Sequence, residues 1–284
     1  MKSICGVEGV GAWGIKEGKF GLALIRASGT SAGVFTSNRM RAAPVEVMME
    51  RMRRGTLDAV VVNSGCANAY TGERGYRDAI AGGALGLAPE SVGVASTGVI
   101  GRYLDLPLIT DQCGRVAPLL ARSGEAEDAA AKAIMTTDTF PKHALVETES
   151  FSVGGITKGS GMIAPNMGTM LAFIYTDAEV EAPVLSDILR TATRRSFNRV
   201  VVDGDTSTND VAFCTATGAA GRVDRDELAR AIETVCRDLA VQIARDGEGA
   251  TKLLEVTVRG APDEDAAAEV ARTIIASPLV KTAI

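Results

Sequence analysis

The sequence predicts an α/β protein, and three observations support this prediction. The first half alternates short runs rich in Val, Leu and Ile with glycine-rich turns, which is typical of strands. The second half carries apolar residues at helical spacing together with capping signals. The 284 residues suffice for one large domain or two ordinary ones, and such a chain buries enough surface to fold without disulfides or metal. The order of the elements lacks the regular rhythm of a doubly wound sheet.

Three strands and one helix are predicted in the first half. The strands are Phe20–Ile25, Ala59–Val62 and Val92–Ala95, because each run is short, apolar and bounded by turn residues. A helical pattern covers Pro44–Arg53, between the first two strands. We find no internal repeat, no low-complexity tract and no linker.

The second half contains the clearest helices. Asp224 provides a side-chain acceptor at a helix start, Glu227 follows three residues later, and apolar residues then recur at helical spacing until Asp246. A second helix is predicted at Asp263–Ala276, after a proline. Between them, Leu253–Val258 alternates apolar and polar residues, which predicts a strand.

Composition excludes several classes of protein. The formal net charge of −5 disfavours a nucleic-acid binder, which usually carries a basic face. The five cysteines are odd in number, widely spaced and without a C-x-x-C pair, so we expect reduced thiols in the cytoplasm. The first residues lack the apolar core of a signal peptide, and no apolar run approaches the ~18 residues of a membrane span. We therefore expect neither nucleic-acid nor membrane partners.

His143 is the single histidine. With only one histidine, the chain cannot form a zinc site that uses two or more histidines, and we expect no metal. A Ser-His-Asp triad would have to use this residue. It follows Pro141 and Lys142 in a polar stretch, so we expect a plain surface or loop histidine.

The most distinctive chemistry lies at Gly168–Thr169, where a glycine precedes a threonine that opens an apolar run. A threonine hydroxyl needs a base to act as a nucleophile. Self-cleavage before Thr169 would free an α-amine, with a pKa of roughly 7.7–8.0, to serve as that base without any histidine. The plain alternative is a threonine that starts a strand after a turn glycine, and this local pattern leaves both open.

A family resemblance appears in the run KGSGMIAPNMGTMLAF, Lys158 to Phe173. It closely resembles the autocleavage segment of the bifunctional ornithine acetyltransferase/N-acetylglutamate synthase family of arginine biosynthesis. Further motifs agree in the same order along the chain: AGVFTSNR, AAPV, NSGCANAYTG, STGVIG, MTTDTFPK, VDGDTSTND, RDGEGATK and SPLVKTAI. The resemblance therefore spans the whole chain.

The resemblance implies a fold and an organisation. The fold would be a layered αββα-type sandwich similar to that of self-cleaving aminopeptidases. Cleavage would divide the precursor into an α chain, residues 1–168, and a β chain beginning at residue 169 and reaching residue 284 here. The mature enzyme would be a cytoplasmic dimer of αβ pairs, an α2β2 heterotetramer, that needs no cofactor.

The resemblance also implies roles for individual residues. Thr169 would be the nucleophile, freed by cleavage after Gly168, and Thr97 and Gly98 would form the oxyanion hole. The positions that match the family's substrate contacts are Thr136, Lys158, Thr169 and Glu248. Lys158 suits the α-carboxylate of a substrate, and Glu248 suits a cationic amine, of which ornithine has two.

The implied reaction is a ping-pong acetyl transfer. Thr169 would take the acetyl group from N2-acetylornithine, release ornithine, and pass the acetyl group to L-glutamate. Some members also accept acetyl-CoA as donor, and the sequence leaves open which type this chain is. Two alternatives stay open as well: a self-cleaving aminopeptidase or amidohydrolase of related fold, and an inactive fragment that serves only as a partner subunit.

Three departures from the family pattern bear on these expectations. Gly168 stands where alanine is usual, and a small residue still precedes the nucleophile, so we expect cleavage to survive. Cys66 stands where asparagine is usual, which predicts a weaker local hydrogen bond, and it has no evident base to act as a nucleophile itself. Family members continue beyond the SPLVKTAI stretch into a segment with two further substrate contacts. We therefore expect this chain to be a fragment that folds poorly or binds substrate weakly.

Overall fold

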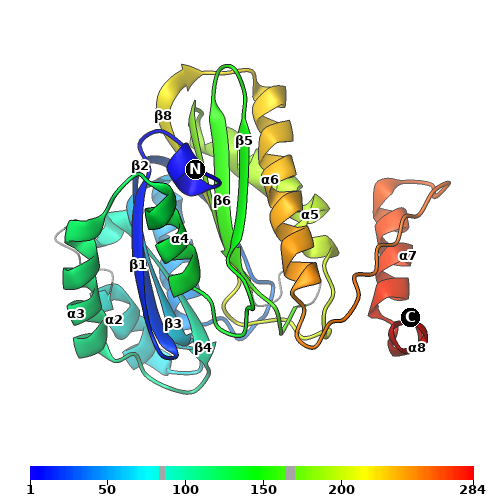
Figure 1. The fold of residues 1–284 in the computed structure, drawn as a ribbon, viewed down its shortest axis with the longest axis horizontal. Helices are drawn as coiled ribbons and strands as arrows, with labels where there is room; N and C mark the ends of the chain where they lie inside the picture. Colours follow the sequence, from blue (N-terminus) through cyan, green and yellow to red (C-terminus); the bar gives the residue numbers. More distant parts are fainter. Residues whose placement is uncertain (83–86, 164–169) are drawn as a thin grey trace.

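A computed structural model describes residues 1–82, 87–163 and 170–284 (Figure 1). Within these residues the strands are β1 Gly11–Glu17, β2 Phe20–Phe35, β3 Thr56–Cys66, β4 Val92–Val99, β5 Lys142–Glu147, β6 Ser152–Lys158, β7 Leu171–Glu179 and β8 Val211–Arg222. The helices are α1 Ala43–Arg51, α2 Gly72–Gly82, α3 Leu106–Val116, α4 Gly124–Ala133, α5 Ala182–Arg195, α6 Arg225–Arg245, α7 Glu264–Ala276 and α8 Pro278–Ala283.

The described strands form one mixed sheet in the order β4-β3-β2-β8-β7-β6-β5, with β1 beside β2. The pairs β3–β4 and β7–β8 are parallel and the others antiparallel. The long strand β2 joins two halves of this sheet. Its first part pairs with β1 and β3, and its last six residues, Thr30–Phe35, pair with β8. The register shifts between Arg26 and Gly29, the kind of irregularity that bends a strand.

The two halves of the sheet share one apolar core. In β2, Ala23 and Ile25 point into this core, where they are joined by Phe173 and Phe213 from the second half. The alternate residues of β2 face a separate cluster with α3. On the far face of the second half, α5 and α6 cover β6, β7 and β8. The predicted layered α/β sandwich is therefore confirmed, and the layers arise because the strands bury both faces.

The capping signal at Asp224 acts as predicted, and Asp263, predicted as the first residue of a helix, is also a cap. The Asp224 carboxylate accepts a hydrogen bond from the Glu227 main-chain N–H at 2.8 Å, which satisfies a donor that the first turn of α6 leaves free. Asp263 does the same for Ala266 at the start of α7, also at 2.8 Å. The predicted helices and strands of the first half form too, and the strands run several residues further than predicted at one or both ends.

Two expectations were wrong. Leu253–Val258 forms no strand, although its exposure does alternate, because no strand of the described residues pairs with its backbone groups. His143 is neither a loop nor a surface residue: it lies in β5, and its ring Nδ1 lies 2.9 Å from the Ser3 hydroxyl. The polar sequence around His143 hid the fact that the N-terminal segment packs over this strand.

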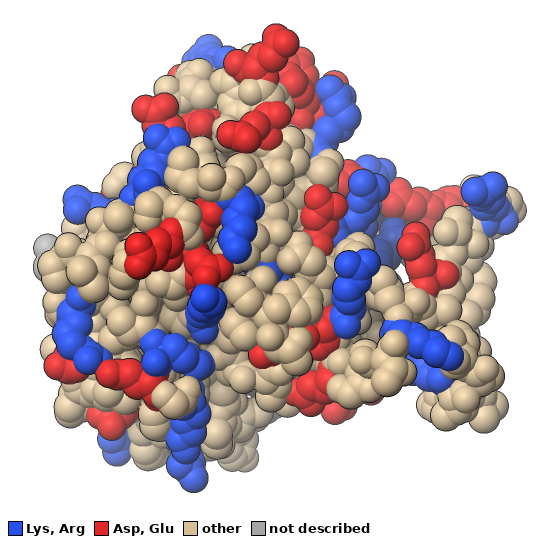
Figure 2. Space-filling model, in the orientation of Figure 1, with Lys and Arg blue, Asp and Glu red and all other residues tan. Residues whose placement is uncertain are grey.

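The surface shows no strong bias of charge on the face drawn in Figure 2, where acidic and basic side chains alternate. All five cysteines are buried and free of disulfides. Along the parts of the chain that the structure describes, no helix is both long and apolar enough to cross a membrane.

Candidate active site

The predicted oxyanion hole lies where two parallel strands end. In β3 and β4, Ser64 pairs with Thr97 and Gly65 pairs with Gly98, so these residues meet at one edge of the sheet. Gly98 has φ +131°, and a Cβ there would lie 2.4 Å from the carbonyl carbon of Gly65. Only glycine fits this close approach of two backbones. The Thr97 side chain is buried beside it.

Asn209, just before β8, is hydrogen-bonded to the ends of β3 and β4. Its side-chain amide donates hydrogen bonds to the carbonyl oxygens of Ala67, at 2.6 Å, and Ser96, at 2.9 Å. The second of these carbonyls belongs to the peptide bond that leads into Thr97. The VDGDTSTND motif therefore fixes the backbone of the predicted oxyanion hole, although it is more than a hundred residues away in sequence.

Lys158 ends β6 with its side chain almost completely buried. Its Nζ donates to the Thr97 hydroxyl oxygen at 3.3 Å and lies 4.0 Å from an Asp138 carboxylate oxygen. Because the Thr97 oxygen accepts from Lys158, its own proton is free to point elsewhere. Burial lowers the pKa of Lys158, and Asp138 is the main group that opposes this shift.

Asp138 is the centre of a group of buried charges that we call the buried cluster: Asp138, Lys142, Lys158 and Asp246. Lys142 Nζ lies 2.7 Å from Asp138 and 2.6 Å from Asp246. Burial would raise the pKa of Asp138, but the two lysines beside it hold that pKa below its usual value. Such buried charges are tolerated only when each is paired and hydrogen-bonded.

The buried cluster also holds the backbone around the predicted substrate residues. Asp138 accepts from the main-chain N–H of Thr136 at 3.0 Å and from that of Gly159 at 2.7 Å. Asp246, at the end of α6, accepts from the main-chain N–H of Thr139 at 3.0 Å. Three separate segments therefore meet on two carboxylates, and the exposed Thr136 is held at their rim.

Glu248 joins the same site from the end of α6. Its main-chain N–H donates to the carbonyl of Ser160 at 2.9 Å, and a Cβ on Gly161 would lie 2.5 Å from the Glu248 carboxyl carbon. The exposed Glu248 carboxylate therefore lies directly over the turn that follows Lys158, and its charge favours the charged form of Lys158.

A further carboxyl group, Asp210, lies beneath this region. It accepts a hydrogen bond from the main-chain N–H of Met170 at 2.9 Å, and its other oxygen has no hydrogen-bond partner in the part of the chain that the structure describes. Burial raises the pKa of Asp210 well above its ordinary value. Asp210 therefore holds the main-chain N–H of Met170, just before β7, with a carboxyl group whose uncharged form is favoured by burial.

The structure brings together four of the predicted site residues, namely Thr97, Gly98, Lys158 and Glu248, with Thr136 at the edge. Gly168 and Thr169 lie outside the described residues. The sequence reasoning missed the roles of Asp138, Lys142, Asp246 and Asp210. The available signal was their position inside motifs of small residues, together with the i, i+4 spacing of Asp138 and Lys142, which is typical of an ion pair.

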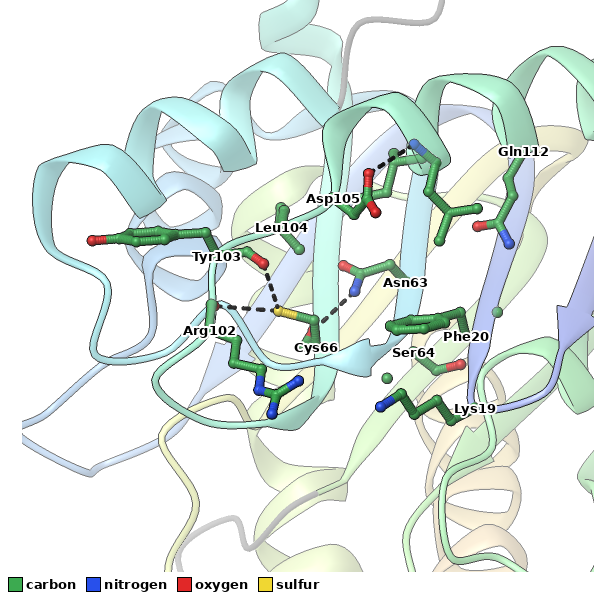
Figure 3. A pocket seen from close by; sticks show the side chains of 14 residues that line it. Lys19, Phe20, Asn63, Ser64, Cys66, Arg102, Tyr103, Leu104, Asp105 and Gln112 are labelled. Carbon is green, nitrogen blue, oxygen red and sulfur yellow. Dashed lines mark hydrogen bonds between the residues drawn. The ribbon is translucent and has the colours of Figure 1, made fainter.

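A separate cavity opens beside α3 and is lined by the end of β3 (Figure 3). Of the predicted substrate-binding and oxyanion residues that the structure describes, none lines it. Cys66 lies in its wall, with Sγ 3.3 Å from the carbonyl oxygen of Arg102 and 3.5 Å from that of Tyr103. Burial raises the pKa of this thiol, which makes it a weak nucleophile.

Comparison with known proteins reveals close relatives. The sequence profile of the ArgJ family matches residues 8–284. A glutamate N-acetyltransferase of Methanosarcina mazei is 51% identical, over 99% of this chain and 74% of the relative. An arginine biosynthesis bifunctional protein ArgJ of Archaeoglobus fulgidus is 49% identical, over 99% of this chain and 75% of the relative.

Solved structures agree with the sequence relatives. The crystal structure of an ornithine acetyltransferase from Mycobacterium tuberculosis, complexed with ornithine, has 34% sequence identity and a TM-score of 0.55, and the match covers 58% of this chain and 95% of that chain. An L-aminopeptidase D-Ala-esterase/amidase from Ochrobactrum anthropi, described as a variant of the Ntn hydrolase fold, matches over 87% of this chain and 86% of that chain with a TM-score of 0.54 and 13% identity. That second likeness concerns the fold alone.

Proposed function

The chain belongs to the ArgJ family, and from that premise we propose that it transfers an acetyl group from N2-acetylornithine to L-glutamate. The reaction belongs to arginine biosynthesis and proceeds through an acetyl group carried on Thr169. The observation that carries the proposal is the contact between Lys158 and Thr97, because the cation proposed to bind the substrate lies beside the hydroxyl proposed to stabilise the oxyanion.

The charges of the site match both substrates. Lys158 binds the α-carboxylate that N2-acetylornithine and glutamate share. Glu248 binds the side-chain ammonium group that only the ornithine skeleton carries. The exposed Thr136 provides a hydroxyl at the rim. The close set of Lys158, Thr136 and Glu248 supports this assignment of the substrate pocket.

The nucleophile arises by self-cleavage between Gly168 and Thr169. The Thr169 hydroxyl attacks the Gly168 carbonyl, the peptide bond becomes an ester, and water hydrolyses the ester to leave a carboxylate on Gly168 and a free α-amine on Thr169. A specific observation supports this step. The matched share of 58% in the Mycobacterium tuberculosis comparison is close to the share of this chain that precedes Thr169.

Acetyl transfer then runs in two matched halves. The Thr169 oxygen attacks the acetyl carbonyl carbon of N2-acetylornithine and gives its proton to the Thr169 α-amine. Thr97 O–H and Gly98 N–H stabilise the tetrahedral oxyanion. The C–N bond breaks, the proton passes to the departing amine, and ornithine leaves. The glutamate amine attacks the acetyl ester and reverses these steps, which restores free Thr169.

From the family resemblance we also propose where the enzyme works, how it assembles and that it needs no cofactor. The enzyme works in the cytoplasm, to which five free, buried thiols are suited, and it assembles as α2β2 without a cofactor. Native mass measurement tests the assembly. Replacing N2-acetylornithine by acetyl-CoA tests whether this enzyme also carries out N-acetylglutamate synthesis from that donor.

The first experiment is the intact mass of the purified protein under denaturing conditions, with N-terminal sequencing of each piece. We expect two chains, one of which begins at Thr169. The Thr169→Ala variant should give one unbroken chain without transfer activity. A cleaved or active Thr169→Ala protein would contradict the assigned nucleophile.

The second experiment separates transfer from hydrolysis. With N2-acetylornithine as donor, steady-state release of ornithine should require glutamate, and N-acetylglutamate should form in equal amount. Continuous release of ornithine and acetate without glutamate, or release of amino acids from peptide N-termini, would instead assign the chain to the hydrolases that share its fold.

A further inference from the structure

Lys16 is a cation close to the buried cluster, and the proposed mechanism gives it no role. It lies near the end of β1, and its Nζ donates to the Ser64 hydroxyl at 2.8 Å and to the carbonyl oxygen of Met135. Ser64 pairs with Thr97 across β3 and β4, and Met135 immediately precedes Thr136. Lys16 is therefore held between the predicted oxyanion hole and the predicted substrate rim.

The charge of Lys16 is not compensated. Both of its hydrogen-bond partners are neutral, and no carboxylate from the described residues lies within 4.0 Å of its Nζ. A lysine ammonium has three N–H donors, so one remains for a ligand. By contrast, Lys142 is closed in by Asp138 and Asp246, and Lys158 has Asp138.

Three lysines thus lie around two buried carboxylates in this region, and Lys16 is the one of the three without a carboxylate partner among the described residues. Burial lowers the pKa of Lys16; Asp138 opposes that shift and Lys158 adds to it. Lys16 donates to Ser64 and Lys158 donates to Thr97, and these two residues pair across β3 and β4, so both ammonium groups lie at neighbouring positions of the sheet edge where one small ligand could meet them. An exposed ammonium beside a buried one favours a ligand that carries two negative groups.

The two proposed substrates differ in the charge at the end of their side chains. N2-acetylornithine carries an ammonium group, for which Glu248 is the partner, whereas glutamate carries a second carboxylate, which Glu248 repels. A site that binds both in turn needs a separate cation for that second carboxylate. Because Lys158 already serves the shared α-carboxylate, the unpaired cation at the rim is the group left to meet this need.

We propose that Lys16 determines the acceptor specificity of the enzyme by binding the side-chain carboxylate of glutamate. This inference rests on the proposed function for the identity of the acceptor. Lys16 should therefore contribute to acetyl transfer to glutamate, the second half of the reaction. It should have little effect on ornithine release, the first half, because N2-acetylornithine has no carboxylate at the end of its side chain.

The test compares glutamate with glutamine, which has the same shape without the side-chain charge. In wild type, glutamate should bind more tightly than glutamine by about 10- to 100-fold, the value of a hydrogen bond to a charged group. In Lys16→Met that preference should fall to within about threefold, while Lys16→Arg should retain most of it. Calorimetry measures binding of each amino acid, and kcat/KM for each acceptor provides the kinetic counterpart.

Lys19 provides a matched control, since it lies three residues away in the β1–β2 turn and lines the cavity of Figure 3. Lys19→Met should keep the wild-type preference for glutamate. Ornithine release from N2-acetylornithine in a single turnover should change less than threefold in Lys16→Met, whereas a merely structural role would slow both halves alike.

The outcomes separate the inference from the proposed function. Wild-type selectivity for glutamate that disappears in Lys16→Met supports the inference, even if no acetyl transfer occurs and the proposed function fails. A Lys16→Met protein that transfers acetyl groups and still prefers glutamate by the wild-type factor would overturn the inference and leave the proposed function standing. Equal wild-type binding of glutamate and glutamine would overturn it as well.

Discussion

Two groups of ion pairs in this protein use the same kinds of residue in opposite surroundings. In the buried cluster, the side chains of Lys142 and Asp138 are both 0% exposed. On the surface, Arg194, Arg195 and Arg199 pair with Glu264 and Asp265 of α7, and the side chains of Arg195 and Glu264 are 39% and 44% exposed. Figure 1 shows α7 beside the main body, to which this surface network ties it.

The comparison shows that the effect of an ion pair depends on whether it is buried. A surface pair stays solvated in either state, so its formation changes stability little. A buried charge loses its water and depends on every partner. The buried cluster therefore fixes the positions of Thr136, Lys158 and the segment before Glu248, whereas the surface network attaches a helix to the side of the molecule.

The most severe way to test this comparison is to remove the shared carboxylate. Asp138→Ala leaves Lys142 with one carboxylate partner and Lys158 with no ion-pair partner among the described residues, so the free energy of unfolding should fall by about 3–5 kcal/mol. Urea denaturation measures this change. A variant as stable as wild type would show that the cluster does not depend on its central charge.

The second test addresses the hydroxyl that the cluster orients. Thr97→Val keeps the shape of the side chain but removes the oxyanion donor, so kcat for acetyl transfer should fall by about 10²–10³-fold. The control is Thr234→Val on the outside of α6, where the hydroxyl bonds only to Arg230 of its own helix. Equal activity of Thr97→Val and wild type would remove Thr97 from the oxyanion hole.

The third test uses the pH dependence of the buried acid Asp210. In the folded state its pKa is raised, so between pH 4 and that value the folded protein binds a proton that the unfolded chain has lost, and stability falls as the pH rises. Asp210→Asn is neutral throughout. Its stability relative to wild type should therefore increase from pH 5 to pH 8, by at most about 1.4 kcal/mol per pH unit.

Thermal or urea unfolding at each pH measures this difference, and the exposed Asp205, in the same motif, provides the control. A constant difference between Asp210→Asn and wild type over this range would mean that Asp210 is charged in the folded protein.

The smallest effect should come from the surface network. A double-mutant cycle with Arg195→Ala and Glu264→Ala should give a coupling energy below about 1 kcal/mol, and it should shrink further in 0.5 M salt. A coupling as large as the loss in Asp138→Ala would erase the distinction between the two groups.

The sequence alone determined much of this protein. Local patterns identified β2, β3, β4, α1, α6 and α7, because burial of one face leaves a regular pattern, and Asp224 marked the start of α6 through its local chemistry. The family resemblance named Thr97, Gly98, Lys158 and Glu248, which the structure then brings together. The assignment of Gly168 and Thr169 stays a prediction.

Only the tertiary structure decided the rest, because it depends on partners distant in sequence. Leu253–Val258 alternates like a strand but has no neighbour to pair with, and His143 is covered by the N-terminal segment. Asp138 and Asp246 are ordinary acids in the sequence. Folding brings these two residues together, although they are more than a hundred residues apart in sequence, and buries them away from water. Lys142 then pairs with both carboxylates, which is why they hold the site in place.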